Sequence, residues 1–379
     1  GSDFCGFLAP AAARPTCNAL GKLTASNLAF DQNADSYAAY LDTNWAFTDA
    51  VKLTLGARYT DDDKKADFTQ LVANPFAAAL RAPETGTYKF SDSKFTYRAV
   101  LSWFVADDKM LFANYSTGYK SGGINSGGSG VALTGKRVFD SENVDDIELG
   151  LKSTWLGGKM TFNATAYRMD IKDFQDRSFI NSSFIVTNAG SLRQQGLEFE
   201  LRAAPAEGFL VNLALAYLDS KFTDFRNAPG LAACPAPPGS ATCPNPQDNT
   251  GKRANYSPEW DATLGLEYGN QFANGMKWSA RADVHYLSEM NTGGTELSDQ
   301  ALIGNSSIMD ARLSLTSSDG TWSASVFGNN LTDKRYIYAQ GGQTLGAALG
   351  VNVPATGATL YRGSITPPRI YGVGLRYRF

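Results

Sequence analysis

The sequence lacks any long hydrophobic run, although 43% of its residues are hydrophobic and 12% are aromatic. No apolar stretch approaches the roughly 18 residues that a membrane-spanning helix requires, which excludes insertion as a helix. Charge of one sign is also missing, because 34 basic and 37 acidic residues give a net charge of −3. The chain has no basic stripe of the kind that nucleic-acid binding requires, so we expect no nucleic-acid partner.

Residues able to bind a metal or to perform catalysis are scarce as well. The chain has one histidine, His285, and it lies far in the sequence from all four cysteines. Asp283 shares its face of an expected strand, a spacing that the β period explains without a catalytic dyad. The sequence contains no nucleophile elbow, phosphate-binding loop or metal-ligand cluster. We therefore predict that the chain is not an enzyme and uses no cofactor and no metal.

The four cysteines form two close pairs, Cys5 with Cys17 and Cys234 with Cys243, each in a stretch rich in small residues and proline. Neither pair has the spacing of a zinc site. We predict two disulfides in extracellular loops, which implies an oxidising compartment such as the cell surface. Residues 1–5 have neither the basic start nor the apolar core of a secretion signal, so we expect that a signal was removed or that the chain begins within a longer protein.

What the sequence does contain is alternation of hydrophobic and polar residues, sustained for about ten residues at a time along nearly the whole chain. This period is typical of β-strands with one apolar face. In residues 160–171 the apolar positions shift from one face to the other, which predicts a β-bulge or a change of environment. The last segment shows the regular pattern, with glycine and arginine opposite Tyr371, Val373, Leu375, Tyr377 and Phe379.

Three features favour a membrane barrel over a soluble β protein. The expected strands match the roughly 9–11 residues that a tilted strand needs to cross hydrocarbon. Tryptophan and tyrosine lie near the ends of the apolar faces, as in the aromatic girdles of outer-membrane barrels. Short turns alternate with long connections, as periplasmic turns alternate with outer loops. The long connections are expected at 63–89, 119–142, 221–257, 289–305 and 337–366.

Counting back from the C-terminus predicts about 13 transmembrane strands, an odd number that cannot close an ordinary bacterial barrel. We therefore expect residues 1–35 to be an extracellular loop and residues 36–379 to be the C-terminal portion of an antiparallel up-and-down β-barrel. The strands are expected at 36–46, 51–62, 90–104, 109–119, 142–154, 159–174, 185–204, 208–220, 258–269, 275–288, 306–317, 321–336 and 367–379.

Several segments resemble the barrel of TonB-dependent receptors. Residues 114–125, which read NYSTGYKSGGIN, are similar to a strand-to-loop segment of that family. Residues 142–153 are similar to its strand ending in ELGxKS, and residues 187–200 to its NAGxxxxxGxExE pattern. NNLTDKRY at 329–336, then Pro368-Arg369 and a terminal Phe379, follow in the order expected of the family.

This resemblance implies a barrel of roughly 22 strands around a plug. The sequence shows no plug, no TonB box and about nine strands too few for such a barrel. The resemblance also implies the outer membrane of a Gram-negative bacterium, with the long loops extracellular and a scarce small-molecule ligand such as siderophore-iron or another nutrient. The implied partners are membrane lipid, the TonB–ExbB–ExbD complex acting through a plug, and the barrel assembly machinery, for which Phe379 is the signal.

Polar faces of the expected strands place ionisable residues of both signs toward the lumen. We interpret these residues as contacts to a plug and as cross-strand pairs, with a ligand-selective lining as the alternative. They are Arg58, Arg98, Glu148, Lys152, Glu198, Glu200, Arg202, Asp261, Glu267, Arg281, Asp283, His285, Asp310, Arg312, Arg376 and Arg378. Candidates for ligand contact at the outer mouth are Tyr119, Lys120, Asn125, Lys136, Arg137, Tyr338 and Gln340.

Two other functions stay open at this level. A barrel without a plug and with a charged lumen would be a passive porin. Long, disulfide-linked loops without transport would suit a surface adhesin or binding platform. A plug and a TonB box in the same gene would favour the importer over both.

Overall fold

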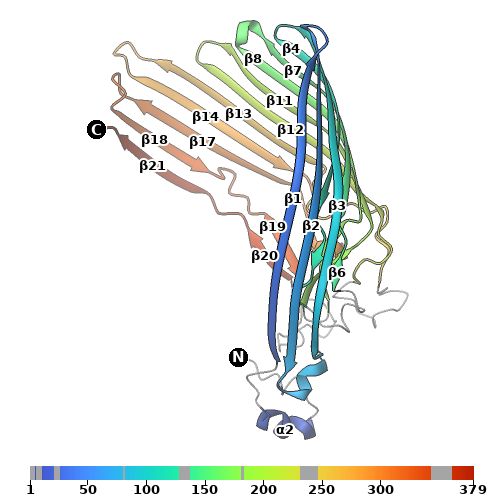
Figure 1. Ribbon diagram of the computed structural model, residues 1–379. Helices are drawn as coiled ribbons and strands as arrows, with labels where there is room; N and C mark the ends of the chain where they lie inside the picture. Colours follow the sequence, from blue (N-terminus) through green and yellow to red (C-terminus); the bar gives the residue numbers. More distant parts are fainter. Residues whose placement is uncertain are drawn as a thin grey trace.

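The computed structural model describes residues 5, 11–20, 26–79, 82–127, 137–180, 183–230, 246–342 and 361–379. Most of them form one antiparallel sheet of thirteen strands that curves into an open trough (Figure 1). The strands of this sheet are β1 (Ser26–Ala46), β2 (Val51–Val72), β3 (Glu84–Ala106), β4 (Lys109–Lys120), β7 (Glu142–Trp155), β8 (Met160–Lys172), β11 (Ser191–Ala206), β12 (Phe209–Asp224), β13 (Trp260–Gln271), β14 (Lys277–Leu287), β17 (Ser306–Thr316), β18 (Trp322–Asn329) and β21 (Ile370–Tyr377).

Shorter elements lie in the long connections. Four two-stranded hairpins occur in the described residues: β5 (Gly123–Ile124) with β6 (Val138–Phe139), β9 (Gln175–Ile180) with β10 (Ser183–Asn188), β15 (Met290–Asn291) with β16 (Leu302–Ile303), and β19 (Ile337–Gly342) with β20 (Tyr361–Ile365). The helical turns are η1 (Ala11–Ala13), α2 (Arg14–Ala19), η2 (Pro75–Ala79), η3 (Leu156–Gly158), η4 (Gly294–Glu296) and η5 (Asp299–Ala301). Among these, no helix is long and apolar enough to cross a membrane.

The predicted number of strands and their antiparallel order are confirmed. One expected strand, 185–204, is divided instead into β10 and β11. The division falls at Gly190, whose φ of +121° is a conformation that other residues rarely adopt. A Cβ there would lie 2.0 Å from the carbonyl oxygen of Asp224, so glycine also permits the close approach of the next strand.

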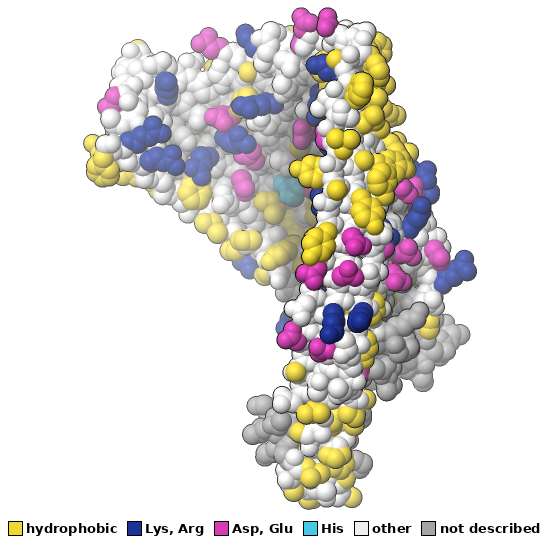
Figure 2. Space-filling model, in the orientation of Figure 1, with side chains coloured by type: hydrophobic (Ala, Val, Ile, Leu, Met, Phe, Trp, Pro, Cys, Tyr) yellow, Lys and Arg dark blue, Asp and Glu magenta, His cyan; other side chains and the backbone are white. Residues whose placement is uncertain are grey.

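The two faces of the sheet differ in chemistry. Odd residues of β12 and even residues of β13 and β14 share the outer face, where Leu213 pairs with Leu264 and Leu264 pairs with Val284. Large apolar side chains on this face are exposed, with Leu313 at 62% and Val373 at 78%. A soluble protein rarely exposes so large an apolar surface, which identifies the outer face as the lipid-facing one. Figure 2 shows hydrophobic side chains along the outer side of β1–β3 and charged ones over the inner face beyond them.

The apolar positions change faces before several strands end. In β8, Phe162 and Ala164 lie on the outer face, whereas Met169 and Ile171 lie on the inner face, where Ile171 is buried. The strand pairs with β7 and β11 without a register shift. The bulge that the sequence allowed is therefore wrong, and the change of environment is confirmed. We call this exchange the phase inversion. On the side of the short turns the outer face of the strand meets lipid, and on the side of the long connections it meets water.

The phase inversion also explains why β1–β3 are longer than expected. Residues 26–35, 63–72 and 84–89 were assigned to loops but continue the strands. In and directly beside this extension the buried hydrophobic residues are Ala66, Phe68 and Phe90, all on the inner face, while the outer face carries aspartate and lysine. Hydrophobic and polar residues still alternate in the extension, but the hydrophobic ones now lie on the inner face. A prediction that looks for one continuous apolar face therefore ends the strands too early.

Within the described ranges the sheet has two open edges. β1 pairs only with β2, and β21 pairs only with β18. Unpaired backbone groups cost several kcal/mol each in hydrocarbon, so both edges need partner strands in a membrane.

Arginine at Leu264 should destabilise the folded protein by about 2–4 kcal/mol, because the residue lies in mid-strand on the lipid-facing side. Arginine at the neighbouring Thr263, which points to the inner face, is the matched control and should cost far less. Urea titrations of the protein refolded into lipid vesicles measure both values. Equal costs for the two substitutions would contradict the assignment of faces.

Candidate functional site at the loop end of the sheet

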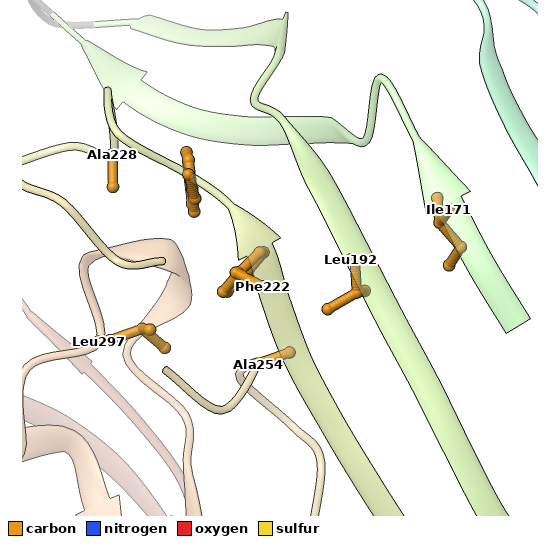
Figure 3. Packing of buried hydrophobic residues seen from close by; sticks show 7 residues of the cluster. Ile171, Leu192, Phe222, Ala228, Ala254 and Leu297 are labelled. Atoms are coloured by element: carbon orange, nitrogen blue, oxygen red, sulfur yellow. The ribbon is translucent and has the colours of Figure 1, made fainter. Parts of the chain in front are cut away.

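The long connections gather at one end of the sheet, opposite the short turns (Figure 1). There they pack onto the inner face through a hydrophobic cluster shown in Figure 3. Ile171, Leu192 and Phe222 supply the strand side of this cluster, from β8, β11 and β12. The loop side is supplied by Phe225, Ala228, Ala254 and Leu297. The loops are thus folded inward over the trough, held by burial of apolar surface.

A second cluster holds the β5–β6 hairpin against the extension of β2 and β3. Ile124 packs with Ala66 and Phe90. Beside it the Arg137 guanidinium lies 3.5 Å from the centre of the Phe68 ring and makes a two-point ion pair with Glu84, at 2.7 and 2.9 Å. Only 2% of Arg137 is exposed, so this residue anchors the loop.

Two asparagines lock neighbouring loops together. The side-chain amide of Asn125 donates to the Val186 carbonyl at 2.9 Å, and its side-chain oxygen accepts the Val186 N–H at 2.7 Å. Asn188 makes the same pair of bonds with the backbone of Asp140, at 2.9 and 2.7 Å. Each carboxamide therefore imitates a backbone strand partner. We call these two contacts the asparagine clamps; they join the β4–β7 loop to the β9–β10 hairpin.

Gln175 adds a third connection between the same loops. Its side-chain amide lies within 3.1–3.3 Å of the carbonyl oxygens of Lys120, Ser121 and Asp140. Its backbone N–H donates to the Glu142 carboxylate at 2.7 Å. This role was not predictable from the sequence, because a glutamine in a loop has no local signature.

The network continues across the remaining loops. The Thr295 hydroxyl donates to the buried carboxylate of Asp176 at 2.8 Å, and the Asn249 amide donates to the Thr295 carbonyl at 2.7 Å. Thr292 and Gln340 exchange hydrogen bonds of 2.9 and 3.0 Å, which ties the β19–β20 hairpin to the β14–β17 loop. The loops that bear these residues therefore form one connected layer, which we call the rim.

The predicted disulfide between Cys5 and Cys17 is confirmed. Both cysteines are fully buried, packed with Ala13 and Phe76 at the tip of the extension. The Asn74 side-chain amide donates to the Cys17 carbonyl at 2.9 Å. The bridge thus closes its own loop and also docks that loop onto the β2–β3 connection. Cys234 and Cys243 lie outside the described residues.

The segment NNLTDKRY forms a compact hydrogen-bonded turn at the loop end of β18. Asn330, 5% exposed, donates from its side chain to the carbonyls of Lys334 and Pro367, and its backbone N–H donates to the Asp310 carboxylate. The backbone N–H of Arg369 donates to Asp333 at 3.0 Å. The resemblance found at 329–336 and at Pro368-Arg369 is thus a single unit that fixes where β21 begins.

The residues expected to contact a ligand have diverse surroundings. Asn125 and Arg137 are buried and used by the rim itself. The Tyr119 hydroxyl donates to the Asp62 carboxylate at 2.7 Å. The Lys120 and Tyr338 side chains are exposed, while Gln340 takes part in the contact with Thr292. Lys136 lies outside the described residues.

The pKa values of Tyr88 on β3 and Asp62 on β2 are displaced from their ordinary values. A hydrogen bond to Glu84, followed by burial, raises the pKa of Tyr88. Burial favours a higher pKa for Asp62, but hydrogen bonds from Ser36, Tyr119 and Ser121 outweigh it and lower the pKa overall. Asp62 therefore stays ionised as an acceptor for Tyr119 at neutral pH.

The register places all of the charged residues expected in the lumen on the inner face, except Arg378, which follows the end of β21. Some of them form ion pairs: Arg281 pairs with Asp283 on the same strand at 2.6 Å and with Glu267 on the neighbouring strand at 3.4 Å. The closest approaches of the other pairs are 2.6 Å for Arg98–Asp42 and 2.9 Å for His285–Asp261. Among the described residues, the other charges of this set make no ion pair: Arg58, Glu148, Lys152, Glu198, Glu200, Arg202, Asp310, Arg312, Arg376 and Arg378.

The Asp42–Arg98 pair spans two strands across Gly56. A Cβ at Gly56 would lie 2.9 Å from the Asp42 carboxylate and 3.0 Å from the Arg98 side chain. Glycine at position 56 therefore leaves room for the Asp42–Arg98 ion pair to connect β1 and β3 across β2.

Replacing Asn188 by alanine should loosen the β9–β10 hairpin from the β4–β7 loop, because the N–H of Asp140 would lose its partner and its C=O would keep only the Gln175 amide. Amide hydrogen exchange at residues 138–140 and 183–188 should accelerate by about tenfold, since an unpaired backbone group costs on the order of 1–3 kcal/mol. Asn143→Ala is the control, because Asn143 makes only one bond of 3.4 Å to Ser141 at the same rim. Equal acceleration in both variants would mean that the clamp has no special role.

The comparisons with known proteins agree with this architecture. The family model described as "TonB dependent receptor-like, beta-barrel" matches residues 6–331. The chain is 23% identical over 197 residues to the probable TonB-dependent siderophore receptor PiuA of Acinetobacter baumannii, a match that covers 51% of this chain and 25% of PiuA. It is 25% identical over 194 residues to the pesticin receptor of Yersinia pestis, covering 50% of this chain and 27% of that protein.

Among solved structures, the ferric yersiniabactin uptake receptor FyuA from Yersinia pestis aligns with a TM-score of 0.68 at 18% identity, over 94% of this chain and 47% of that one. The copper transporter OprC aligns with a TM-score of 0.65 at 14% identity, over 92% of this chain and 49% of that one. The chain thus spans less than half the length of these relatives. Since the family model covers most of the sequence, this chain belongs to the TonB-dependent receptor-like β-barrel family.

Proposed function

We propose that this chain is the ligand-capturing part of an outer-membrane importer of a Gram-negative bacterium. The observation that carries the proposal is the rim, in which long loops fold inward as one bonded layer above a charged inner face. A passive pore needs an open mouth, whereas a capture site needs loops held over the lumen. The exposed apolar outer face supports residence in the membrane, with the rim on the extracellular side.

The ligand that we propose is a scarce, small nutrient complex, with iron bound to a siderophore as the first candidate. PiuA and FyuA are described as siderophore and ferric yersiniabactin receptors, which supports this class. OprC is described as a copper transporter, so other nutrients stay within the proposal. Exposed Lys120 and Tyr338 are the contact residues that we favour, because Asn125 and Arg137 are committed to the rim.

Unpaired charges on the inner face are consistent with a plug domain that occupies the trough. Glu198, Arg202 and Arg376 face the trough without an ion-pair partner among the described residues, and charges left in this state favour an oppositely charged surface. We propose that a plug domain contacts them and transmits force from the TonB–ExbB–ExbD complex. Further strands of the same protein would cover the two open edges and close the barrel.

The C-terminal residue has the exposure that an assembly signal needs. Phe379 is fully exposed, and its ring lies edge-on to that of Tyr377 at 5.2 Å. We propose that the barrel assembly machinery recognises this end of β21 while the edge is still unpaired.

Uptake by cells tests the proposal. The intact protein, expressed in a Gram-negative strain that lacks its own iron receptors, should import at least one radiolabelled ferric siderophore from a panel. Import should stop when tonB is deleted, because release into the periplasm needs TonB. Uptake that survives the deletion would identify a passive porin, and cell or protein adhesion without uptake would identify a binding platform.

The contact residues have their own test in the same cells. Lys120→Ala with Tyr338→Ala should raise the half-saturating ligand concentration by about tenfold at an unchanged maximal rate, as expected when two contacts are lost from binding. Tyr37→Ala is the control, since Tyr37 is exposed on the outer face of β1. A change in maximal rate alone would place Lys120 and Tyr338 outside the ligand site.

A further inference from the structure

A patch of hydroxyl side chains lies on the inner face of the sheet, close to the short turns. Two neighbouring rows of the register cross β14, β17 and β18 at this place. They bring together the side chains of Ser279, Ser314, Thr316, Ser323 and Ser325. Gly374 of β21 stands opposite Ser325 and continues the same floor. We call this surface the hydroxyl patch.

The hydroxyl groups of the patch have almost no partners within the protein. Among the described residues, the one side-chain hydrogen bond to the patch runs from the Arg312 guanidinium to the Ser325 hydroxyl, at 3.4 Å. The other four side chains of the patch make none with that part of the chain. A hydroxyl group can donate to an anion, so the patch offers donors that the fold itself does not use.

Three cations border the hydroxyl patch. Lys277 stands opposite Thr316 in the β14–β17 register, and Arg376 stands opposite Ser323 in the β18–β21 register. Arg312 lies next to the patch on β17. All three cations are exposed, and none of them makes an ion pair with a described residue. Figure 2 shows lysine and arginine side chains gathered on the inner face near the C-terminal end of the sheet.

The last strands carry an excess of positive charge although the whole chain is slightly negative. Residues 306–379 contain seven basic and three acidic side chains, whereas the net charge of the chain is −3. Of the three carboxylates, that of Asp333 forms an ion pair with Arg369 at the loop end, and those of Asp310 and Asp319 form none with the described residues. The described residues therefore leave the cations of the patch uncompensated.

Elsewhere the inner face carries charge of both signs. Glu148 and Lys152 share the inner face of β7, and Glu198, Glu200 and Arg202 share that of β11. A folded plug, whose surface has both signs, suits that part of the wall. A surface lined by one sign instead attracts small ions of the opposite sign and raises their local concentration. The hydroxyl patch is therefore suited to a small anionic ligand.

We propose that the hydroxyl patch is an exit site, which binds the anionic oxygen atoms of the ligand as it leaves the barrel on the side of the short turns. The ligand class is a metal chelate of negative net charge with carboxylate or catecholate oxygens. The hydroxyl groups donate to these oxygens, and Lys277 and Arg312 supply the opposite charge. Arg376 borders the patch on the side where the plug contact is proposed. The inference rests on the proposed import function and adds the charge of the ligand.

Charged thiol reagents measure the electrostatic potential at the patch in the intact, detergent-purified protein. The Ser314→Cys variant is treated with an anionic sulfonate methanethiosulfonate and with its cationic trimethylammonium counterpart. The anionic reagent should react about tenfold faster, relative to the ratio for a free thiol in solution, because the patch attracts anions. Lys277→Gln with Arg312→Gln should bring this ratio close to one. The parent protein without the new cysteine gives the background.

Two controls separate a local site from the overall charge of the protein. Thr165→Cys places the thiol on the inner face opposite Glu198, where the anionic reagent should have no advantage. Arg58→Gln with Lys152→Gln removes two inner-face cations from β2 and β7 and should leave the ratio at Ser314→Cys unchanged. No preference at the patch, or an equal fall in this control, would overturn the inference. Protection of Ser314→Cys from both reagents would also overturn it, because the plug would then occupy the patch.

Import by cells that express the intact protein connects the patch to transport. Anionic chelates such as ferric enterobactin are compared with cationic ones such as ferrioxamine B. Lys277→Gln with Arg312→Gln should lower the maximal import rate of an anionic chelate about fivefold at an unchanged half-saturating concentration, because the rim is intact. Heat-modifiable mobility on gels verifies that each variant is folded.

The import results also separate this inference from the proposed function. An unchanged rate, or an equal loss for a cationic chelate, would overturn the exit site. Import of only neutral or cationic chelates by the native protein would overturn the exit site and leave the proposed function standing. Import of no chelate at all would remove both.

Discussion

The whole structure depends on one constraint, that backbone N–H and C=O groups must be paired wherever the chain meets hydrocarbon. Thirteen strands meet it by hydrogen bonding to their neighbours in chain order. Once these hydrogen bonds are formed, successive side chains must point to opposite faces of the sheet. Leucine, valine and tryptophan face lipid, and charged residues such as Arg281 and Asp283 turn inward to pair with one another.

The same constraint explains the phase inversion. Where the strands leave the membrane, the outer face meets water and the inner face is covered by loops, so the apolar residues exchange sides. Ile171, Leu192 and Phe222 are buried under the loops for this reason, on the faces opposite to Phe162, Leu197 and Leu215. The inversion therefore marks the border of the membrane in the sequence itself, and the charged groups beyond it meet lipid headgroups on the outside and loops on the inside.

Much of the fold was predictable because the membrane imposes one rule on every strand. The number and order of the strands follow from alternation alone. The extension of β1–β3 was missed because its apolar residues, such as Ala66 and Phe68, alternate in the opposite phase. The rim was predictable only as a set of long loops. Asn125 and Arg137 were expected to contact a ligand at the outer mouth, but both are buried, and their burial depends on Val186 and Glu84, which are distant in sequence and follow no local pattern.

The segments that carry the family resemblance turn out to be anchors of the rim. Asn125, Glu142, Asn188 and Asn330 each hold a loop or a strand end by hydrogen bonds to distant backbone groups. Residues that fix the rim are thus separate from residues available to a ligand, which lets the exposed positions vary while the frame is kept.

Site-directed spin labelling along β11 in lipid vesicles tests the central claim most directly, because one strand contains both sides of the inversion. Labels at Leu197, Phe199 and Leu201 should be accessible to oxygen dissolved in lipid, and a label at Arg193 should be accessible to a water-soluble nickel reagent. A label at Leu192 should be shielded from both. Lipid accessibility at Leu192, or no exchange of accessibility between Leu197 and Arg193, would contradict the account.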